Sequence, residues 1–434
     1  MQFDKARLVL RSAAVASALG LLAVPAQATE GYFALGFGPV QRGQGGAGVA
    51  AEGSNAMAST INPAAVAGMG REMSLGLQLF MPYRGYNASG TGFVAPGSLR
   101  SGHNGFAVPN FAYNMPLANG AVLNFAAYGN GGMNTSYPLV LNSSPGCVAA
   151  APPGMNYGAF CGGQAGVDLN QLFLSFTYAQ KVGNVSFGIA PTIAGQAFKA
   201  WGLGAFTGLS ASPSNLTNNG YSYSLGYGLR GGIQVEVSPV LSVGVAAQTK
   251  MKMSSFDKYA GLFAGGGSFD IPASATIGLA YKATPSVTLM ADVQRIFYSG
   301  VPAVSNPFPN GANPLGGANG PGFGWDDVNV FKLGAVWKAS DKMTWRVGYA
   351  HSSNPIGPED VTLNILAPGV VTNHFSLGGT YQMTKRDSVD FSVVYVPPVS
   401  VTGQEITPSG PTPGSSVTID MHQFSASVGW TRKF

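Results

Sequence analysis

His374 and Ser376 are the residues in this sequence whose types and spacing could perform hydrolysis. They stand two apart in the stretch TNHFSLGG, so both side chains lie on one face if this stretch is a strand. A serine nucleophile also needs a base that a third group orients, and no such group is evident nearby. The other histidines, His103, His351 and His422, lack the spacing of metal ligands. We therefore expect no enzyme, no metal site and no cofactor.

A second chemical possibility is a disulfide between Cys147 and Cys161, which lie in one long loop-like segment. The chain begins like an exported protein, because Lys5, Arg7 and Arg11 precede the apolar run SAAVASALGLLAV and the cleavage pattern AQA. This run is shorter than the roughly 20 residues of a membrane-spanning helix. We expect residues 1–28 to be a signal peptide. Export permits the disulfide, and two free thiols are the alternative.

The composition is unusual for a surface in contact with water. Of the 434 residues only 9% are charged, against about 25% in a soluble domain, and 62 are glycine. The basic residues are scattered rather than gathered in a stripe, which argues against nucleic-acid binding. An exported chain that is poor in charge and rich in glycine fits a β-barrel of the outer membrane.

Alternation of apolar with small or polar residues, the pattern of a barrel strand, recurs along the chain. In YSYSLGYGLRGGIQVEV, residues 221–237, the aromatic and aliphatic side chains share one face. Six connections are short turns, such as KVGN and KASDK, and seven are long, which predicts periplasmic turns and external loops. We predict an all-β transmembrane antiparallel barrel of about fourteen strands: roughly 72–82, 105–115, 120–136, 168–181, 184–200, 221–237, 241–255, 269–283, 286–299, 326–338, 342–353, 370–384, 387–397 and 417–434.

The segment 29–70 suits neither a helix nor a strand, because it is rich in glycine, alanine and serine. A barrel of fourteen strands is too wide for its own side chains to fill, so we expect this segment to plug the barrel, 71–434, as a hatch. Pro63 fixes one φ angle and Asn62 can bond its own backbone, so the motif Asn62-Pro63-Ala64 marks a fixed turn. Small residues let an irregular chain pack against the wall; the glycines concerned are Gly43, Gly45, Gly46 and Gly48.

The stretch GYFALGFGPVQRGQGGAGVAAEGSNAMASTINPAAVAG, ahead of such a barrel, resembles the FadL family of outer-membrane transporters. That family includes long-chain fatty acid transporters and uptake channels for toluene and xylene. The resemblance implies passive import of hydrophobic molecules through a hatch-gated pocket, with release sideways at an inward kink of the third strand. Gly129, Asn130, Gly131 and Gly132 would form this kink, and an ordinary bulge is the alternative.

Long-chain fatty acids are the substrate that we favour, with aromatic hydrocarbons as the alternative and a general diffusion porin as a weaker rival. By alternation, five basic residues face the lumen and could bind a carboxylate: Arg230, Lys250, Lys252, Lys332 and Arg346. They could instead contact the hatch or the acids Glu236, Asp292 and Asp390. Apolar loop residues could form an exposed capture surface or pack on each other: Phe206, Phe256, Leu262 and Phe263.

The C-terminus also suggests partners. Phe434, with aromatic or apolar residues at alternate positions before it, looks like an outer-membrane assembly signal. We therefore expect contact with the barrel assembly machinery, outer-membrane lipid and lipopolysaccharide, and we expect the protein to reside in the bacterial outer membrane. A pore with its own exit needs no second copy, so we expect a monomer.

Overall fold

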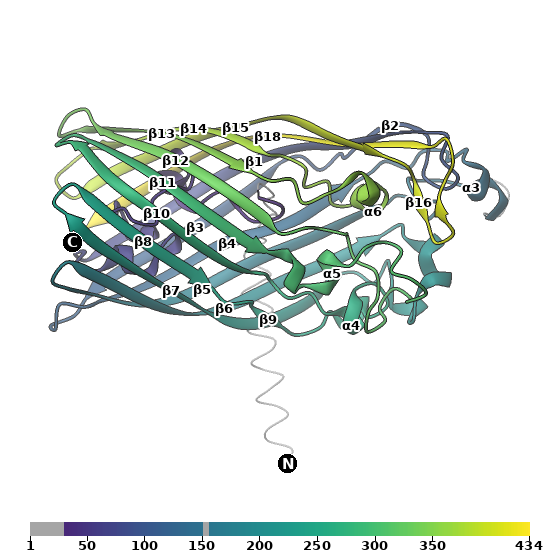
Figure 1. Ribbon diagram of the computed structural model, residues 1–434, viewed down its shortest axis with the longest axis horizontal. Coiled ribbons are helices and arrows are strands. Elements are labelled where there is room, and N and C mark those ends of the chain that lie inside the picture. The colour runs from purple at the N-terminus through teal and green to yellow at the C-terminus, as the bar shows by residue number, and fades with distance from the viewer. Residues whose placement is uncertain (1–29, 151–155) are drawn as a thin grey trace, which may run out of the picture.

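Most of the chain forms one antiparallel sheet that closes on itself (Figure 1). The computed structural model describes residues 30–150 and 156–434, so the expected signal peptide, 1–28, lies outside the described residues. In this part of the chain the sheet has sixteen strands, of which β2 (Gly97–Arg100) and β9 (Lys252–Met253) are short additions. The other fourteen form the wall: β1 (Glu72–Ser89), β3 (Phe106–Pro116), β4 (Val122–Ser136), β5 (Gly166–Val182), β6 (Val185–Trp201), β7 (Ser222–Ser238), β8 (Leu241–Gln248), β10 (Ala273–Thr284), β11 (Val287–Phe297), β12 (Val328–Lys338), β13 (Met343–Ser352), β14 (Asn373–Gln382), β15 (Asp387–Gly403) and β18 (Ser416–Lys433). Each wall strand pairs with its neighbours in chain order, and β18 pairs with β1 to close the barrel.

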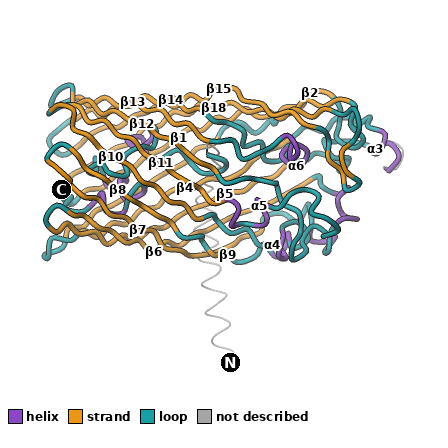
Figure 2. Tube along the Cα trace, viewed as in Figure 1, coloured by secondary structure: helices purple, strands orange, loops and turns teal. Residues whose placement is uncertain are grey.

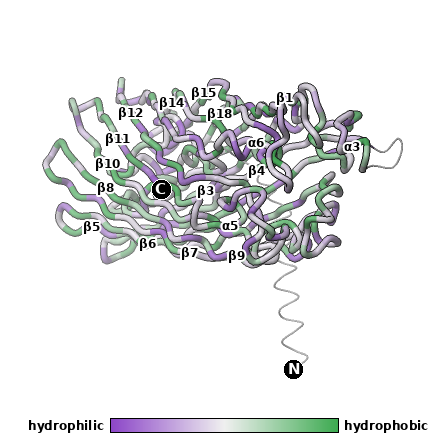
Figure 3. The backbone as a smooth tube through the Cα atoms, turned by 45° about the vertical axis from the view of Figure 1, so that its right-hand side comes forward, coloured by the Kyte–Doolittle hydropathy of each residue, from purple (hydrophilic) through white to green (hydrophobic). Residues whose placement is uncertain are grey.

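Alternation along these strands separates an apolar outer face from an inner face. On β1, Leu75, Leu77 and Leu79 are exposed, whereas the intervening Ser74 and Gln78 are buried. Hydrophobic and hydrophilic positions alternate along the other strands as well (Figure 3). This confirms the predicted fourteen-stranded β-barrel, whose outer surface suits the hydrocarbon of a bilayer.

Two strands continue further than predicted. β1 and β15 extend to Ser89 and Gly403, and β18 pairs with both along this extension. Beyond Tyr83 and Pro398 the outward side chains there are polar, and Thr402 and Thr418 form a hydrogen bond of 2.8 Å across the ladder. Because the extension has so few outward apolar residues, the alternation pattern does not reveal it.

The two ends of the barrel differ in their connections (Figure 2). One, the short-turn end, carries tight turns, and the other, the long-loop end, carries the short elements α3 (Pro145–Ala150), η3 (Gly204–Leu209), η4 (Pro213–Asn215), η5 (Asp257–Tyr259), α4 (Ala264–Gly267), η6 (Tyr298–Gly300), α5 (Pro302–Ser305), η7 (Pro358–Asp360), α6 (Val361–Asn364), β16 (Ile406–Thr407) and β17 (Gly410–Pro411). Residues 30–70, called the hatch below, lie inside the barrel toward the short-turn end and contain α2 (Gly38–Gly43), η1 (Ala56–Thr60) and η2 (Pro63–Val66). No helix in the described residues is long and apolar enough to cross a membrane.

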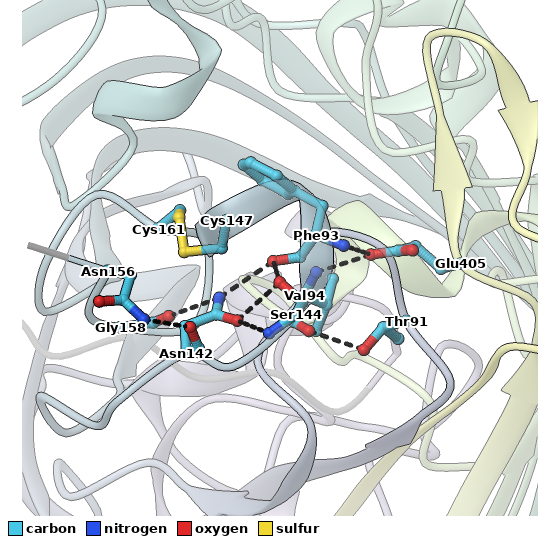
Figure 4. Close-up of a disulfide and its surroundings, with 10 residues drawn as sticks. All are labelled: Thr91, Phe93, Val94, Asn142, Ser144, Cys147, Asn156, Gly158, Cys161 and Glu405. Carbon is cyan, nitrogen blue, oxygen red and sulfur yellow. Dashed lines mark hydrogen bonds between the residues drawn. A yellow bond between two sulfur atoms is a disulfide. The ribbon is translucent and has the colours of Figure 1, made fainter. Parts of the chain in front are cut away.

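At the long-loop end, one carboxylate joins two loops (Figure 4). Glu405 is fully buried and accepts hydrogen bonds from the backbone N–H groups of Phe93, at 2.9 Å, and of Val94, at 2.6 Å. It accepts two more from the N–H of Gly92 and the hydroxyl of Thr412. Three bonds to one charged group therefore hold the first and last long loops together, and the fourth, from Thr412, fixes Glu405 within its own loop, which is a strong arrangement.

The second long loop is tied to the first in the same region. A disulfide joins Cys147, in α3, to Cys161 (Figure 4). The Asn142 side chain donates to the carbonyl oxygens of Phe93, at 3.0 Å, and Gly158, at 3.1 Å. Three loops therefore form one connected cap over part of the long-loop end.

We expect Glu405→Ala to loosen this cap while the barrel stays folded. The substitution leaves three buried N–H groups without their acceptor, which costs about 3 kcal/mol locally. Hydrogen exchange at the amides of residues 92–94 should therefore become about a hundredfold faster, since 1.4 kcal/mol is a factor of ten. Glu359→Ala, which removes an exposed acid from another loop, is the control and should leave this exchange unchanged. Equal protection in the two variants would contradict the role given to Glu405.

Candidate functional site

The hatch lies close against the inner wall because its glycines have no side chains. Gly45 and Gly46 have φ angles of 69° and 70°, which L residues with a Cβ rarely adopt. A Cβ on Gly46 would stand 1.8 Å from the carbonyl oxygen of Leu35, and one on Gly45 would stand 2.9 Å from the Tyr349 nitrogen on β13. Gly43 likewise faces Gly378 on β14, and Gly48 has a φ of 129°. Gly43 and Gly45 therefore allow the close approach of the hatch to the wall, and Gly46 allows close packing within the hatch.

Wall side chains pair with the hatch backbone. Asp292, on β11, accepts hydrogen bonds from the N–H groups of Gly48 at 2.8 Å and Val49 at 3.0 Å. Gln234, on β7, donates from its amide to the carbonyl oxygens of Val49 at 3.0 Å and Ala51 at 2.8 Å. An irregular buried segment needs such partners, because it has no ladder of its own.

The Asn62-Pro63-Ala64 motif forms the turn that its residue types predict. The Asn62 Oδ1 atom accepts from the N–H of Ala64 at 2.9 Å, and its Nδ2 donates to Val49 O at 2.7 Å. Ala64 is buried, and Pro63 packs so closely on β6 that a Cβ on Gly188 would lie 2.4 Å from its carbonyl carbon. The motif therefore joins two parts of the hatch and fixes both against the wall.

Three of the five candidate cations are engaged by the hatch or by the wall. Arg230 donates to Tyr128 Oη at 2.9 Å and to the carbonyl oxygens of Ser59 and Thr60. Lys332 lies 2.9 Å from the carboxylate of Glu30, and both side chains are buried. Burial raises the pKa of Glu30 above its ordinary value, and the Lys332 ammonium opposes that shift. These contacts match the alternative in which lumen cations hold the hatch.

Arg346 belongs to a network on the wall itself. It donates to Thr380 Oγ1 at 2.7 Å, and Thr380 donates in turn to Asp390. Thr431 donates to the other oxygen of Asp390 at 2.9 Å, so this carboxylate has two hydroxyl partners. The network links β13, β14, β15 and β18 and therefore reinforces the wall.

The prediction that Lys250 and Lys252 face the lumen is wrong. Gln248 is paired with Arg230 and faces inward, but Lys252 is paired with the outward-facing Tyr227. Both lysines are exposed, and Lys250 forms an ion pair with Asp270 at 3.2 Å. The cause is a shift of one residue between β8 and β9, because such a shift moves every later side chain to the other face.

The four apolar loop residues do not form an exposed capture surface. Phe206, Phe256 and Phe263 are buried, and Leu262 is partly buried against them. They belong to an aromatic cluster inside the long-loop end, in which Phe198 and Phe263 have ring centroids 4.8 Å apart. The cluster reaches the hatch at Tyr32, whose N–H donates to Tyr298 Oη at 3.0 Å. The interior above the hatch is therefore lined by aromatic side chains.

The wall has a gap beside the third strand. Pairing of β3 with β4 ends at Asn110 and Tyr128, whereas β4 continues to Ser136 and stays paired with β5. The β4–β5 register shifts between Gly129 and Gly131, so the predicted glycine stretch contains a bulge at Asn130. Beyond this bulge the free edge of β4 no longer faces β3.

The hatch takes the place that β3 leaves. The N–H of Ala34 donates to Asn130 O at 3.1 Å, and the N–H of Gly132 donates to Tyr32 O at 3.2 Å. The backbone groups that the kink exposes are thus satisfied by the first residues of the hatch. The hatch and the gap therefore share hydrogen bonds.

Apolar side chains fill the gap in this structure. Phe80, Phe106 and Val108, from β1 and β3, pack with Leu172 from β5, and Leu174 lies against them. On the outside, an apolar depression of about 660 Å³ borders the gap, with Leu77, Pro109, Phe111, Ala127 and Leu172 among its lining residues. Sequence reasoning missed Phe106, because the inward positions of β3 also include Val108 and Ala112 and therefore do not single it out.

His374 and Ser376 are both buried on the inner face of β14, as their alternation predicts. This placement keeps them away from the lipid face.

A lipid-facing barrel with an internal hatch defines an outer-membrane transport channel. Residues 166–430 match the family described as Outer membrane protein transport protein (OMPP1/FadL/TodX). The chain therefore belongs to this family, which transports hydrophobic compounds across the outer membrane and is not enzymatic. A comparison with curated proteins gave no match.

Solved structures share the fold at low sequence identity. The toluene transporter TodX of P. putida has a TM-score of 0.66 and 17% identity, over 92% of this chain and 99% of that one. A FadL homologue of Pseudomonas aeruginosa has a TM-score of 0.66 and 16% identity, over 93% and 100%. The toluene transporter TbuX of Ralstonia pickettii has a TM-score of 0.61 and 19% identity, over 92% and 99%.

We expect Asp292→Ala to release the central part of the hatch and to raise ion conductance. The substitution leaves two buried N–H groups without an acceptor, at a cost of about 2–4 kcal/mol. Single-channel recording in planar bilayers should show openings that the native protein lacks. Asp341→Ala removes a fully exposed acid at the short-turn end and is the control. If the native protein, Asp292→Ala and Asp341→Ala give the same conductance, Asp292 does not hold the hatch closed.

Proposed function

We propose that this channel imports small apolar molecules of the aromatic-hydrocarbon type by passive diffusion. The main support for this proposal is that none of the five candidate cations is free to bind a carboxylate inside the lumen. Arg230, Lys332 and Arg346 are engaged by the hatch or the wall, and Lys250 and Lys252 lie outside the lumen. None of the five therefore offers a fatty acid the free guanidinium or ammonium that its carboxylate would need.

The lining of the interior supports the same substrate class. The aromatic cluster above the hatch suits flat apolar molecules, because aromatic rings pair favourably at centroid distances of about 4.5–7 Å. Tyr32 and Tyr298 form such a pair at 5.2 Å, and Trp325 lies 5.3 Å from Tyr298. Two of the similar solved structures are described as toluene transporters, which agrees with this proposal.

The exit that we propose is the wall gap. A solute that reaches the hatch meets the Glu30–Lys332 ion pair. The gap beside Asn130 is lined instead by apolar side chains, those of Phe80, Phe106, Val108 and Leu172. The apolar depression on the outside of the gap would receive the solute directly into the bilayer. In this route Gly129, Asn130, Gly131 and Gly132 keep β4 away from β3. One chain supplies pocket, hatch and gap, so we propose that it acts as a monomer.

We expect cells that lack other hydrocarbon channels to take up labelled toluene several-fold faster when they produce this protein. Oleate uptake in the same cells should not increase, because no candidate cation is free to hold its carboxylate. Initial uptake rates at low concentration of each solute measure both effects. Faster uptake of oleate alone would replace the proposal with fatty acid transport, the second candidate function.

We expect Phe106→Ala to widen the gap and to increase the toluene uptake rate about fivefold. This factor corresponds to a barrier lowered by about 1 kcal/mol, less than the full packing energy of a buried phenylalanine. Phe331→Ala, on the lipid face of β12, is the control and should leave uptake unchanged. If Phe106→Ala leaves the rate unaltered while the barrel folds, the gap is not the exit.

A further inference from the structure

Arg84 is a buried cation that the proposed transport route does not use. It lies on β1 beyond the predicted end of the first strand, faces the interior and is 5% exposed. Its Nη1 donates to Pro82 O at 3.2 Å, and its Nη2 donates to His103 O at 2.6 Å. Its Nε atom has no hydrogen-bond partner, and it forms no ion pair among the described residues.

A second unpartnered group lies beside it. Asn134, on β4 past the kink, is 5% exposed, and both its Oδ1 and its Nδ2 lack partners among the described residues. Arg84 and Asn134 line the same cavity, whose other walls include Met133, Trp325, Gly369 and Met421. Its volume is about 20 Å³, which is room for one water molecule or one ion of similar size.

Arg84 differs from the buried Lys332 in having no counter-ion among the described residues. Lys332 is also buried, but the carboxylate of Glu30 lies 2.9 Å from its ammonium. The two carbonyl oxygens at Arg84 satisfy N–H groups without cancelling the positive charge. Leaving a buried charge uncompensated costs several kcal/mol. A water molecule could bond to Arg84 Nε, but it would not supply the missing negative charge.

We propose that this cavity binds one small monovalent anion, held by Arg84 Nε and by the side-chain amide of Asn134. The cavity size suits an ion such as chloride and excludes sulfate or phosphate. A carboxylate that carries a hydrocarbon chain needs more room than such an ion, so the anion is a free ion of halide size. The site does not depend on the substrate proposed above.

The position of the site connects it to the wall gap. The Arg84 guanidinium lies 5.8 Å from the ring centroid of Phe106, which fills the gap. Asn134 belongs to the part of β4 that has separated from β3. A bound anion therefore links β1 to the separated part of β4 on the long-loop side of the gap.

Bromide tests the site in the full-length mature protein. Crystals soaked in sodium bromide should show an anomalous peak between Arg84 Nε and Asn134 Nδ2. In solution, replacing gluconate by chloride at constant ionic strength should raise the thermal midpoint in a saturable way, because the ligand binds the folded state. This increase should be absent in Arg84→Gln and retained in Arg295→Gln, which changes an exposed, paired arginine.

A parallel titration with decanoate tests the size limit of the site. Stabilisation by decanoate that Arg84→Gln abolishes, without an effect of chloride or a bromide peak, would contradict a site for a small free ion. Chloride stabilisation with the bromide peak, and no effect of decanoate, supports the proposal. A native protein that shows no bromide peak and no response to either anion holds only water there, and the proposal is then wrong. These readouts do not involve toluene, so they stand whether or not hydrocarbon uptake is observed.

Discussion

The width of a fourteen-stranded barrel is the constraint on which the rest of this structure depends. Side chains alone cannot fill such a lumen, so a second segment must enter it, and each backbone group of that segment then needs a partner. Asp292 and Arg230 on the wall and Asn62 within the hatch supply these partners. Arg230 and Lys332, which look available to a ligand in the sequence, are therefore committed to holding the hatch.

The same requirement couples the hatch to the wall gap. A strand that bends away from its neighbour exposes N–H and C=O groups, which are costly to leave unpaired at membrane depth. Here Tyr32 and Ala34 occupy the exposed edge of β4 at Asn130 and Gly132. Any movement of the first hatch residues must break these bonds, so the hatch cannot move without loosening one side of the gap.

The sequence predicted the barrel well because its signal is local and repeated. Apolar and polar residues alternate in almost every strand, and because this pattern recurs fourteen times, a few ambiguous strand ends do not change the predicted fold. It failed at Lys250 and Lys252, where one extra residue reverses the faces without any compositional trace. Arg84 was missed because β1 continues beyond its last outward apolar residue. The packing of Phe106 on Leu172 joins strands far apart in the sequence, so no local pattern contains it.

The interior divides into two zones whose border lies at the kink of β4. Toward the short turns lies the polar network of the hatch, in which Asp292 binds backbone N–H groups. The Glu30–Lys332 ion pair lies next to the border, where Glu30 O accepts from Tyr298 Oη, and neither group offers an apolar solute a favourable contact. Toward the long loops the aromatic cluster offers it favourable contacts. At the border, the wall beside Asn130 is closed by hydrocarbon and aromatic side chains rather than by a continuous ladder. Moving such side chains costs less than breaking buried ion pairs, which is the physical reason for the sideways route into the bilayer that we propose for an apolar solute.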